Sequence, residues 1–235
     1  MFKSFIIAID GPAGSGKSTT AKLIAQKLGF LYIDTGAMYR AITLAAIRNG
    51  VLNNLDEVIK LANNYEIELR YSGNGTSVFL NGKEITEEIR SPEVNVNVSP
   101  VSKIQGVREA LVRKQRLMAT KNNGIVMEGR DIGTVVFPNA DVKIFLTASI
   151  EQRAERRAKE YQAKGTIIPF EEIKSNIETR DKIDSTRENS PLVKSHDAHE
   201  IDTSRITIDE QVTKIIKIIQ ETAKRKNIEI DFNKN

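Results

Sequence analysis

The sequence predicts an α/β fold in which a doubly wound parallel sheet carries helices on both faces. Two observations lead to this expectation. Short apolar runs of strand length alternate along the chain with longer segments whose apolar residues recur every three or four positions. The runs are apolar throughout, as in strands that are covered on both sides. A chain of 235 residues can bury a complete core, so we expect one folding unit.

The first half of the chain begins as strand, helix and strand, and then changes character. Buried strands are expected at Phe5–Ile9 and Phe30–Ile33. Between about Tyr65 and Arg90, apolar residues alternate with polar ones, which indicates a small antiparallel insert. Its turn is expected at Ser72-Gly73-Asn74-Gly75. The helices expected in this half span about Thr19–Leu28, Ala37–Asn49 and Leu55–Asn63.

The second half returns to alternating helices and buried strands. One long basic helix is expected from about Val101 to Lys121. The chain end at Asp231–Asn235 is expected to fray. The strands expected here are Ile125–Met127, Val142–Leu146 and a short one at Ala198–Ile201. The helices expected here are Ile150–Lys164, Phe170–Lys182 and Ile208–Lys224.

The most specific motif lies directly after the first strand. Gly11-Pro12-Ala13-Gly14-Ser15-Gly16-Lys17-Ser18 matches the phosphate-binding P-loop, and the following helix begins at Thr19. Glycines let the backbone curl so that successive N–H groups point into one concavity, where the helix adds its positive end. The motif therefore predicts a P-loop NTPase that binds ATP along Gly11–Thr19. Lys17 would reach the β- and γ-phosphates, and Ser18 would ligate Mg²⁺.

Composition narrows the class of protein. The chain has no cysteine, which excludes disulfides, thiolate catalysis and cysteine-ligated zinc and indicates a cytoplasmic location. The net charge of +4 suits anionic substrates, but acidic residues are interspersed with basic ones, so we expect no nucleic-acid binding. The first apolar run, about five residues long, is too short for a membrane span, and no membrane association is expected. His196 and His199 follow Pro191 in a loop-like stretch and are not expected to bind a metal.

Three further segments bring arginine side chains toward the ligand-binding edge of the predicted sheet. In α/β sheets that edge lies at the carboxyl ends of the strands. Asp34–Arg40 begins where the second strand ends, and Glu128–Thr134 follows another buried strand. Arg180, Asp184 and Arg187 would share one face of a continuous helix. Arginines in these places predict a second, phosphate-bearing substrate beside the P-loop.

Taken together, these segments resemble the bacterial cytidylate kinases, which transfer a phosphoryl group from ATP to CMP or dCMP. The resemblance covers essentially the whole chain. It implies a P-loop core made of residues 1–62, 100–148 and 190–235, an enlarged monophosphate-binding insert at 63–99, and a helical lid with its flanking helix at 149–189. The matching stretches are Gly11–Thr19, Asp34–Arg40, Val107–Leu111 with Arg113–Arg116, Gly129–Pro138 and Arg180–Leu192.

The resemblance also assigns roles around the two phosphate groups. Thr35, Arg40 and Arg130 would surround the phosphate of the acceptor. The family often has Ser where Thr35 stands, and Thr keeps the hydroxyl. Among the lid arginines, Arg153 and Arg157 would close over the transferring group. These two alternate with glutamates, a pattern that is equally typical of a solvated helix.

Base and sugar recognition are assigned in the same way. Ser99, Arg108 and Asp131 would read the cytosine ring, whose exocyclic amine needs an acceptor such as Asp131. Uracil presents a carbonyl at that position and would leave the buried acceptor unpaired. The sugar and nearby phosphates would be bound by Arg180, Asp184 and Arg187, and the division of roles between the two arginines stays open.

The expected reaction is in-line attack of the CMP phosphate on the γ-phosphorus of ATP. An acceptor phosphate is largely ionised near neutral pH, so positioning and charge neutralisation supply most of the acceleration. Two alternatives remain: a P-loop kinase acting on UMP, and a nucleotide switch or nucleic-acid-binding protein. No guanine-reading Asn-Lys-x-Asp motif stands in a suitable place, which argues against a GTPase. No apolar surface stripe is evident, and we expect a monomer. The residues expected to be catalytic are Lys17, Arg130, Arg153 and Arg157.

Overall fold

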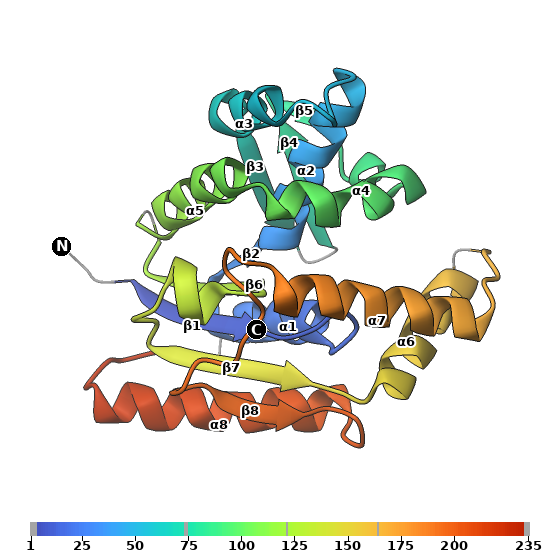
Figure 1. The fold of residues 1–235 in the computed structure, drawn as a ribbon. Helices are drawn as coiled ribbons and strands as arrows, with labels where there is room; N and C mark the ends of the chain where they lie inside the picture. The colour runs from blue at the N-terminus through green and yellow to red at the C-terminus, as the bar shows by residue number, and fades with distance from the viewer. Residues whose placement is uncertain (1–3, 73–74, 121, 164, 233–235) are drawn as a thin grey trace.

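Five parallel strands form the central sheet, in the order β2-β6-β1-β7-β8 (Figure 1). The structure is a computed structural model that describes residues 4–72, 75–120, 122–163 and 165–232. The first strand lies in the middle and later strands are added on both sides of it, so the doubly wound arrangement predicted from the sequence is confirmed. The strands are β1 (Phe5–Asp10), β2 (Leu31–Asp34), β6 (Gly124–Gly129), β7 (Val142–Thr147) and β8 (His199–Asp202).

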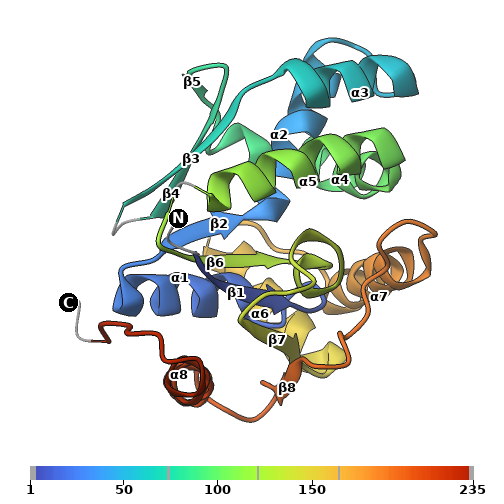
Figure 2. The same cartoon turned by 90° about the vertical axis from the view of Figure 1, so that its left-hand side faces the viewer.

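Helices cover both faces of this sheet (Figure 2). Because side chains alternate along a strand, Ile7 packs with helices α1 (Lys17–Leu28) and α8 (Ile208–Arg225). Its neighbour Ala8 belongs to a separate apolar cluster on the opposite face. That second cluster is formed with α2 (Thr35–Arg48), α3 (Leu55–Asn64) and α5 (Gln105–Ala119).

A second, three-stranded antiparallel sheet stands above the central one, as the alternating pattern predicts. Its strands run in the order β3-β4-β5, and Ile67 of β3 pairs with Leu80 of β4. The expected turn includes residues 73 and 74, which lie outside the described part of the chain. The elements of this region are β3 (Ile67–Ser72), β4 (Gly75–Leu80), β5 (Lys83–Glu84) and a short 3₁₀ helix at Glu88–Arg90.

The prediction of one long helix over Val101–Lys121 is wrong. The structure has two helices, α4 (Pro92–Lys103) and α5, separated at Ile104, whose backbone is extended. Helix α4 begins with Ser91 as its cap, whose hydroxyl accepts from Val94 N at 3.4 Å, and Pro92 occupies the first turn. The Ser91-Pro92 sequence is typical of a helix start and indicates where α4 begins. Residue 121 lies outside the described residues.

Helices α6 (Ile150–Ala163) and α7 (Phe170–Thr186) form a pair at the carboxyl end of the sheet. They pack through a small apolar cluster that includes Ala154, Ile173 and Ile177. Helix α7 runs four residues beyond its predicted end, so Arg180 and Asp184 share one helix. The expectation that Arg187 continues this helix is wrong, because the helix ends at Thr186 and the backbone of Arg187 is extended. Residue 164, the predicted end of the first of these helices, and residues 233–235, in the tail expected to fray, are outside the described chain. Within the described residues, no helix has the length and hydropathy needed to cross a bilayer.

Helix α8 begins with a capping box that generates a prediction about stability. The Thr207 hydroxyl accepts from Glu210 N at 3.2 Å, and the Glu210 carboxylate accepts from Thr207 N at 2.8 Å. We expect Thr207→Ala to lower the free energy of unfolding by about 1 kcal/mol because it leaves a helix N–H unpaired. The measurement is urea unfolding beside Thr213→Ala, an exposed position in the same helix. Equal losses in both variants would contradict the capping argument.

Candidate active site

The loop between β1 and α1 is shaped by close backbone packing. Gly11 has φ +148°, and a Cβ there would lie 2.1 Å from the carbonyl oxygen of Leu146. Gly16, with φ +89°, precedes α1 and offers no side-chain cap. The first N–H groups of α1 therefore have no side chain as partner at Gly16 and lie at the positive end of the helix dipole. This arrangement suits an anion.

Lys17 is buried beside this loop. Its ammonium donates to the carbonyl oxygen of Pro12 at 2.6 Å. Burial lowers its pKa to about 7, and the positive charges of Arg130 and Arg180 add to this effect, while Glu128 opposes it. A lysine in these surroundings gains strongly when a polyphosphate supplies negative charge.

Glu128, the penultimate residue of β6, ties the loop to two neighbouring strands. Ser18 donates its hydroxyl to Glu128 Oε2 at 2.9 Å, and the Tyr32 phenol donates to the other carboxylate oxygen. Thr35 donates its hydroxyl to the Glu128 carbonyl oxygen at 2.7 Å. The register places Glu128 opposite both Ile9 and Asp34, so three strand ends meet here. Burial raises the pKa of the Glu128 carboxyl.

Arginines converge on the same edge from α2, α7 and the segment after β6. Arg130 Nε lies 2.8 Å from Asp184 Oδ2, and Arg40 Nη2 lies 3.2 Å from Asp34 Oδ2. Arg187 lies farther from Asp184, at 3.9 Å. Burial lowers the pKa of Arg180 to about 10, and the charge of Arg130 adds to this. Among the described residues, buried N–H donors without a partner include Nε of Arg40, Arg108 and Arg180, and Nη2 of Arg187.

Arg108 and Asp131 form a buried ion pair beneath this group. Arg108 also donates to the carbonyl oxygen of Ser102 at 3.1 Å, and its guanidinium lies 5.4 Å from the ring centroid of Tyr39. Ser99 stands one turn earlier in α4, where its carbonyl oxygen accepts from Ser102. The backbone contact to Arg108 thus comes from Ser102.

The arginines of α6 differ sharply in their surroundings. Arg153 is buried and donates to the carbonyl oxygen of Ala13 at 3.2 Å, while pairing with Asp181 of α7 at 2.5 Å. Arg156 donates to the carbonyl oxygen of Gly14 at 3.2 Å. Arg157 lies at the surface, paired with a glutamate of its own helix. Arg153 and Arg156 of α6 therefore both hydrogen-bond to the backbone of the P-loop.

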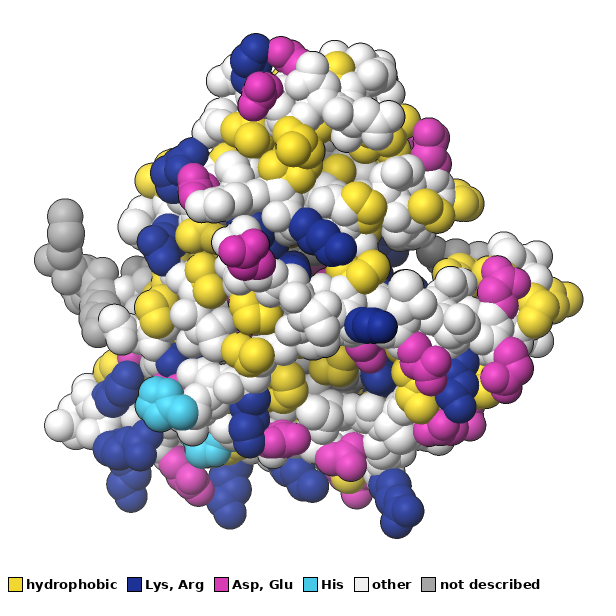
Figure 3. Space-filling view, viewed as in Figure 1, with side chains coloured by type: hydrophobic (Ala, Val, Ile, Leu, Met, Phe, Trp, Pro, Cys, Tyr) yellow, Lys and Arg dark blue, Asp and Glu magenta, His cyan; other side chains and the backbone are white. Residues whose placement is uncertain are grey.

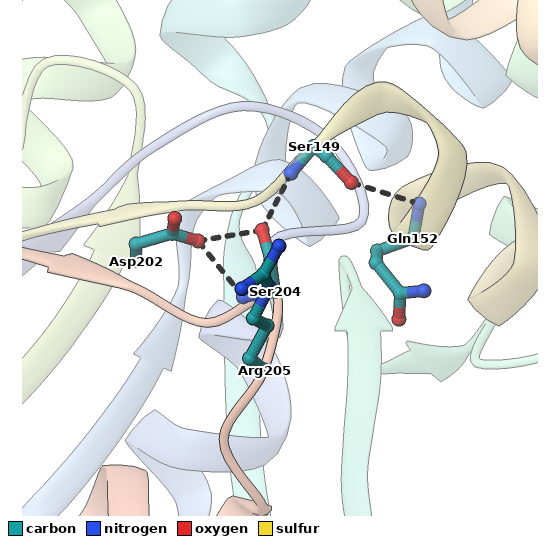
Figure 4. A pocket seen from close by; sticks show the side chains of 5 residues that line it. All are labelled: Ser149, Gln152, Asp202, Ser204 and Arg205. Carbon is teal, nitrogen blue, oxygen red and sulfur yellow. Dashed lines mark hydrogen bonds between the residues drawn. The ribbon is translucent and has the colours of Figure 1, made fainter.

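A polar pocket of about 530 Å³ opens beside these two arginines, at the carboxyl ends of β7 and β8 (Figure 4). Asp202 accepts from the backbone N–H of Ser204, whose hydroxyl accepts from Ser149 N at 2.8 Å. Between these residues and the P-loop stands Thr203, which donates its hydroxyl to the carbonyl oxygen of Ser15 at 3.2 Å. The pocket is lined by Ser149, Gln152, Asp202, Ser204 and Arg205.

Basic and acidic side chains are interspersed along the lower part of the face in Figure 3, near α8. In the described part of the chain, no three His, Asp or Glu side chains gather where they could share one metal ion. The side chain of His196 is exposed and lies 3.9 Å from Asp197 Oδ1.

The family model for cytidylate kinases matches residues 7–221. This chain belongs to the cytidylate kinase family. Three cytidylate kinases illustrate the similarity. That of Geobacillus sp. (strain WCH70) is 53% identical over 92% of this chain and 96% of its own, and that of Ligilactobacillus salivarius is 51% identical over 94% and 99%. That of Pediococcus pentosaceus is 49% identical over 96% of this chain and 100% of its own.

Among solved structures, a gluconokinase from Sinorhizobium meliloti aligns over 96% of both chains with 14% identity and a TM-score of 0.49. The fold of this cytidylate kinase family member is assigned from the order of its parallel strands and from the position of its P-loop between β1 and α1.

The structure brings most of the predicted site residues to one edge of the sheet. The P-loop residues Gly11–Thr19 lie there, and so do the side chains of Thr35 and Arg130. Among the described residues, the side chains of Ser99 and Arg157 make no hydrogen bond or ion pair with this group, although the charge of Arg157 acts on Arg180. Residues that sequence reasoning did not assign, although their contacts join the site, are Asp10, Tyr32, Tyr39, Ser102, Arg156 and Asp181.

The different surroundings of two α6 arginines generate a prediction. We expect Arg153→Ala to lower the free energy of unfolding by about 2–3 kcal/mol because it leaves Asp181 without its partner and frees the Ala13 carbonyl. Arg157→Ala removes an exposed ion pair and a surface contact with the Tyr161 ring, 5.7 Å away, and should cost less, about 0.5–1 kcal/mol. Urea unfolding of both variants measures the difference. Similar stabilities would show that the Arg153 contacts do not anchor the loop.

Proposed function

We propose that the protein transfers the γ-phosphoryl group of ATP to CMP or dCMP, giving CDP or dCDP. The observation that carries this proposal is the group of buried guanidinium donors without partners beside an anion-binding P-loop. Two phosphorylated ligands would satisfy those donors and offset the mutual repulsion of the cations. Curated relatives about half identical over nearly the whole chain are named cytidylate kinases, which supports the same reaction.

The triphosphate of ATP would lie in the P-loop, with Lys17 holding the β- and γ-phosphates. The residues present also fit Mg²⁺, because the Ser18 hydroxyl and the nearby Glu128 carboxylate offer the hard oxygen atoms that this ion prefers. When bound, Mg²⁺ would offset charge on the phosphates. The Ser18 hydroxyl donates its hydrogen bond to Glu128, so its lone pairs are free to point toward a metal ion. Ser18 would be the metal ligand.

The nucleoside of ATP would extend from the P-loop toward the pocket beside Thr203. Support comes from adjacency, since Thr203 bonds Ser15 of the loop, and from Arg156, which bonds both Gly14 and Thr203. The pocket offers an amide, hydroxyls and a carboxylate, which suit the polar edge of a base.

The acceptor phosphate would lie against Thr35, Arg40 and Arg130. Asp184 holds Arg130, and the positive charges of Arg130 and Arg180 keep the pKa of Asp184 below its ordinary value although burial raises it. Asp184 therefore stays ionised near neutral pH and can accept from a sugar hydroxyl. Arg180 and Arg187 would supply donors to the sugar and the phosphate.

Cytosine would be read by Asp131, Arg108 and Ser99. Asp131 is buried and can accept from an exocyclic amine, whereas a uracil carbonyl at that point would face a carboxylate. Arg108 would donate to a ring acceptor while its other contacts, with Ser102 and Tyr39, fix its position.

In this proposal, catalysis depends on position and charge. Lys17 and Arg130 would neutralise the transferring group between the two substrates. Arg153 would act by holding the P-loop and Asp181, and Arg157 would be the lid arginine free to move toward the phosphates. The lid would comprise residues 149–189, and the acceptor insert residues 63–99.

We further propose a monomer in the cytoplasm that binds neither nucleic acid nor membrane. Light scattering coupled to gel filtration tests the first point, and titration with an oligonucleotide at low salt tests nucleic-acid binding.

The reaction itself is tested by ADP release with ATP, Mg²⁺ and each common nucleoside monophosphate. We expect rapid turnover with CMP and dCMP, slow turnover with UMP, and none with AMP or GMP. Chelation of the metal with EDTA should abolish turnover. Turnover with AMP but not CMP would refute the proposal, and equal turnover with UMP would favour the broader pyrimidine kinase.

Base selection generates a separate prediction for Asp131. We expect Asp131→Asn to reduce the ratio of kcat/KM for CMP to that for UMP by about tenfold or more, since an amide can donate to the uracil carbonyl. Asp197→Asn, a surface carboxylate paired with Lys143, is the control. An unchanged ratio in Asp131→Asn would remove this residue from base reading.

A further inference from the structure

Asp10 is a buried carboxylate that the proposed reaction does not use. It is the last residue of β1 and immediately precedes the P-loop. Its Oδ1 accepts from the backbone N–H of Ile132 at 2.8 Å, and its Oδ2 accepts from the backbone N–H of Gly133 at 2.7 Å. Only 6% of Asp10 is exposed. Both carboxylate oxygens are thus committed to one short backbone segment from a distant part of the chain.

That segment begins directly after the two acceptor-binding residues. Arg130 and Asp131 follow the end of β6, and a π-helical turn at Ile132–Val136 comes next. Its last N–H groups bond within the turn: those of Val135 and Val136 donate to the carbonyl oxygen of Asp131. The first two N–H groups of the turn, those of Ile132 and Gly133, donate to Asp10. Asp10 therefore fixes the place where the acceptor segment turns away from the sheet.

We propose that Asp10 is a positioning residue that holds Arg130 and Asp131 in register with the P-loop, so that acceptor and ATP meet in line. The proposal rests on the function proposed above. Asp10 acts through the backbone of Ile132 and Gly133, which lie between it and any acceptor contact. It joins the start of the ATP-binding loop to the start of the acceptor-binding turn by two hydrogen bonds.

Pairing of both N–H groups with Asp10 requires an ionised carboxylate. Two N–H donors face two oxygens, and an asparagine amide or a protonated carboxyl group would present a donor to one of them. A Cβ at Gly133 would lie 3.4 Å from Asp10 Oδ2, an ordinary contact distance, and 3.2 Å from Lys143 Cδ, so the lysine stem packs closely against this position. This pair of hydrogen bonds therefore depends on the two acceptor oxygens of an ionised Asp10.

Charged groups surround Asp10 on each side. Lys17 of α1 favours its ionised form, and Asp131 opposes it. Lys143 of β7 contributes its stem here, while its ammonium bonds Asp197 at 2.9 Å. Glu128 of β6 lies opposite the preceding residue of β1. Burial, the largest effect, raises the pKa of Asp10 to about 6.

The pH dependence follows directly. Above about pH 6 the ionised carboxylate accepts from both N–H groups, and below it the protonated group accepts from one. Acceptor binding should weaken on acidification for this reason, in addition to the effect of protonating the phosphate of CMP itself.

The test compares wild type with Asp10→Asn and a matched control, Asp141→Asn. Asp141 is also a buried carboxylate that accepts from a β1 N–H, that of Ile6 at 2.9 Å, but it lies at the opposite end of the strand. At pH 8 we expect Asp10→Asn to raise the calorimetric Kd for CMP about tenfold and to lower kcat, with the Kd for ATP within about threefold of wild type. Asp141→Asn should leave all three unchanged.

The same titrations at pH 5.5 separate positioning from simple destabilisation. The ratio of the Kd values of Asp10→Asn and wild type for CMP should fall from about ten toward one, because wild type has then lost the same bond; the ionisation of CMP cancels in this ratio. A ratio that stays constant with pH, or a tenfold loss in Asp141→Asn as well, would overturn the proposal.

A measurement on the wild-type protein needs neither a variant nor turnover. In ¹⁵N-correlated NMR spectra, the amide signals of Ile132 and Gly133 should titrate together with a midpoint near pH 6. Amide signals that do not move would overturn the proposal even if the protein phosphorylates CMP. Failure of the CMP assay with titrating amides would instead refute only the proposed function.

Discussion

Lys17, Arg130 and Arg180 repel one another at the carboxyl edge of the central sheet, where burial deprives them of water. The rest of the site follows from this constraint. Asp184 and Glu128 offset part of the charge, yet buried guanidinium donors remain unpaired. A bound polyphosphate and a bound monophosphate would offset the repulsion between the cations and would accept hydrogen bonds from the unpaired donors. Ion pairs with Asp184 and Asp34 hold Arg130 and Arg40 at this edge in the free protein.

Strand ends hold these charges in place, because a parallel sheet brings distant parts of the chain to one edge. Asp34 is aligned with Glu128, and Asp10 is aligned with Gly129. Each of the three carboxylates at these ends accepts from a backbone N–H or a hydroxyl of a neighbouring segment, so each fixes a loop as well as balancing charge. Helix α6 completes the support from outside, where Arg153 bonds a P-loop carbonyl.

Local patterns in the sequence predict the buried strands, the P-loop and the convergence of arginines, since each depends on neighbouring residues and on the rule that parallel strand ends meet. Helix α4 escaped prediction because its valines, asparagines and Pro100 are weak helix formers, although Ser91-Pro92 marks its start. Arg153 has the spacing of a surface helix residue, and only packing against Ala13 shows that it is buried. Contacts such as Asp10 with Gly133 join residues far apart in the chain, and no periodicity encodes them.

The central sheet separates two large apolar clusters, and this division limits how far the effect of a core substitution can spread. Ile7 and Ala8 are neighbours in β1, yet they belong to different clusters. One cluster contains α1 and α8, which support the P-loop, and the other contains α2, α4 and the antiparallel sheet. Repacking in the second cluster is separated from the first by the sheet backbone. A substitution that repacks the second cluster is therefore screened from α1 and α8 by the backbone of the sheet.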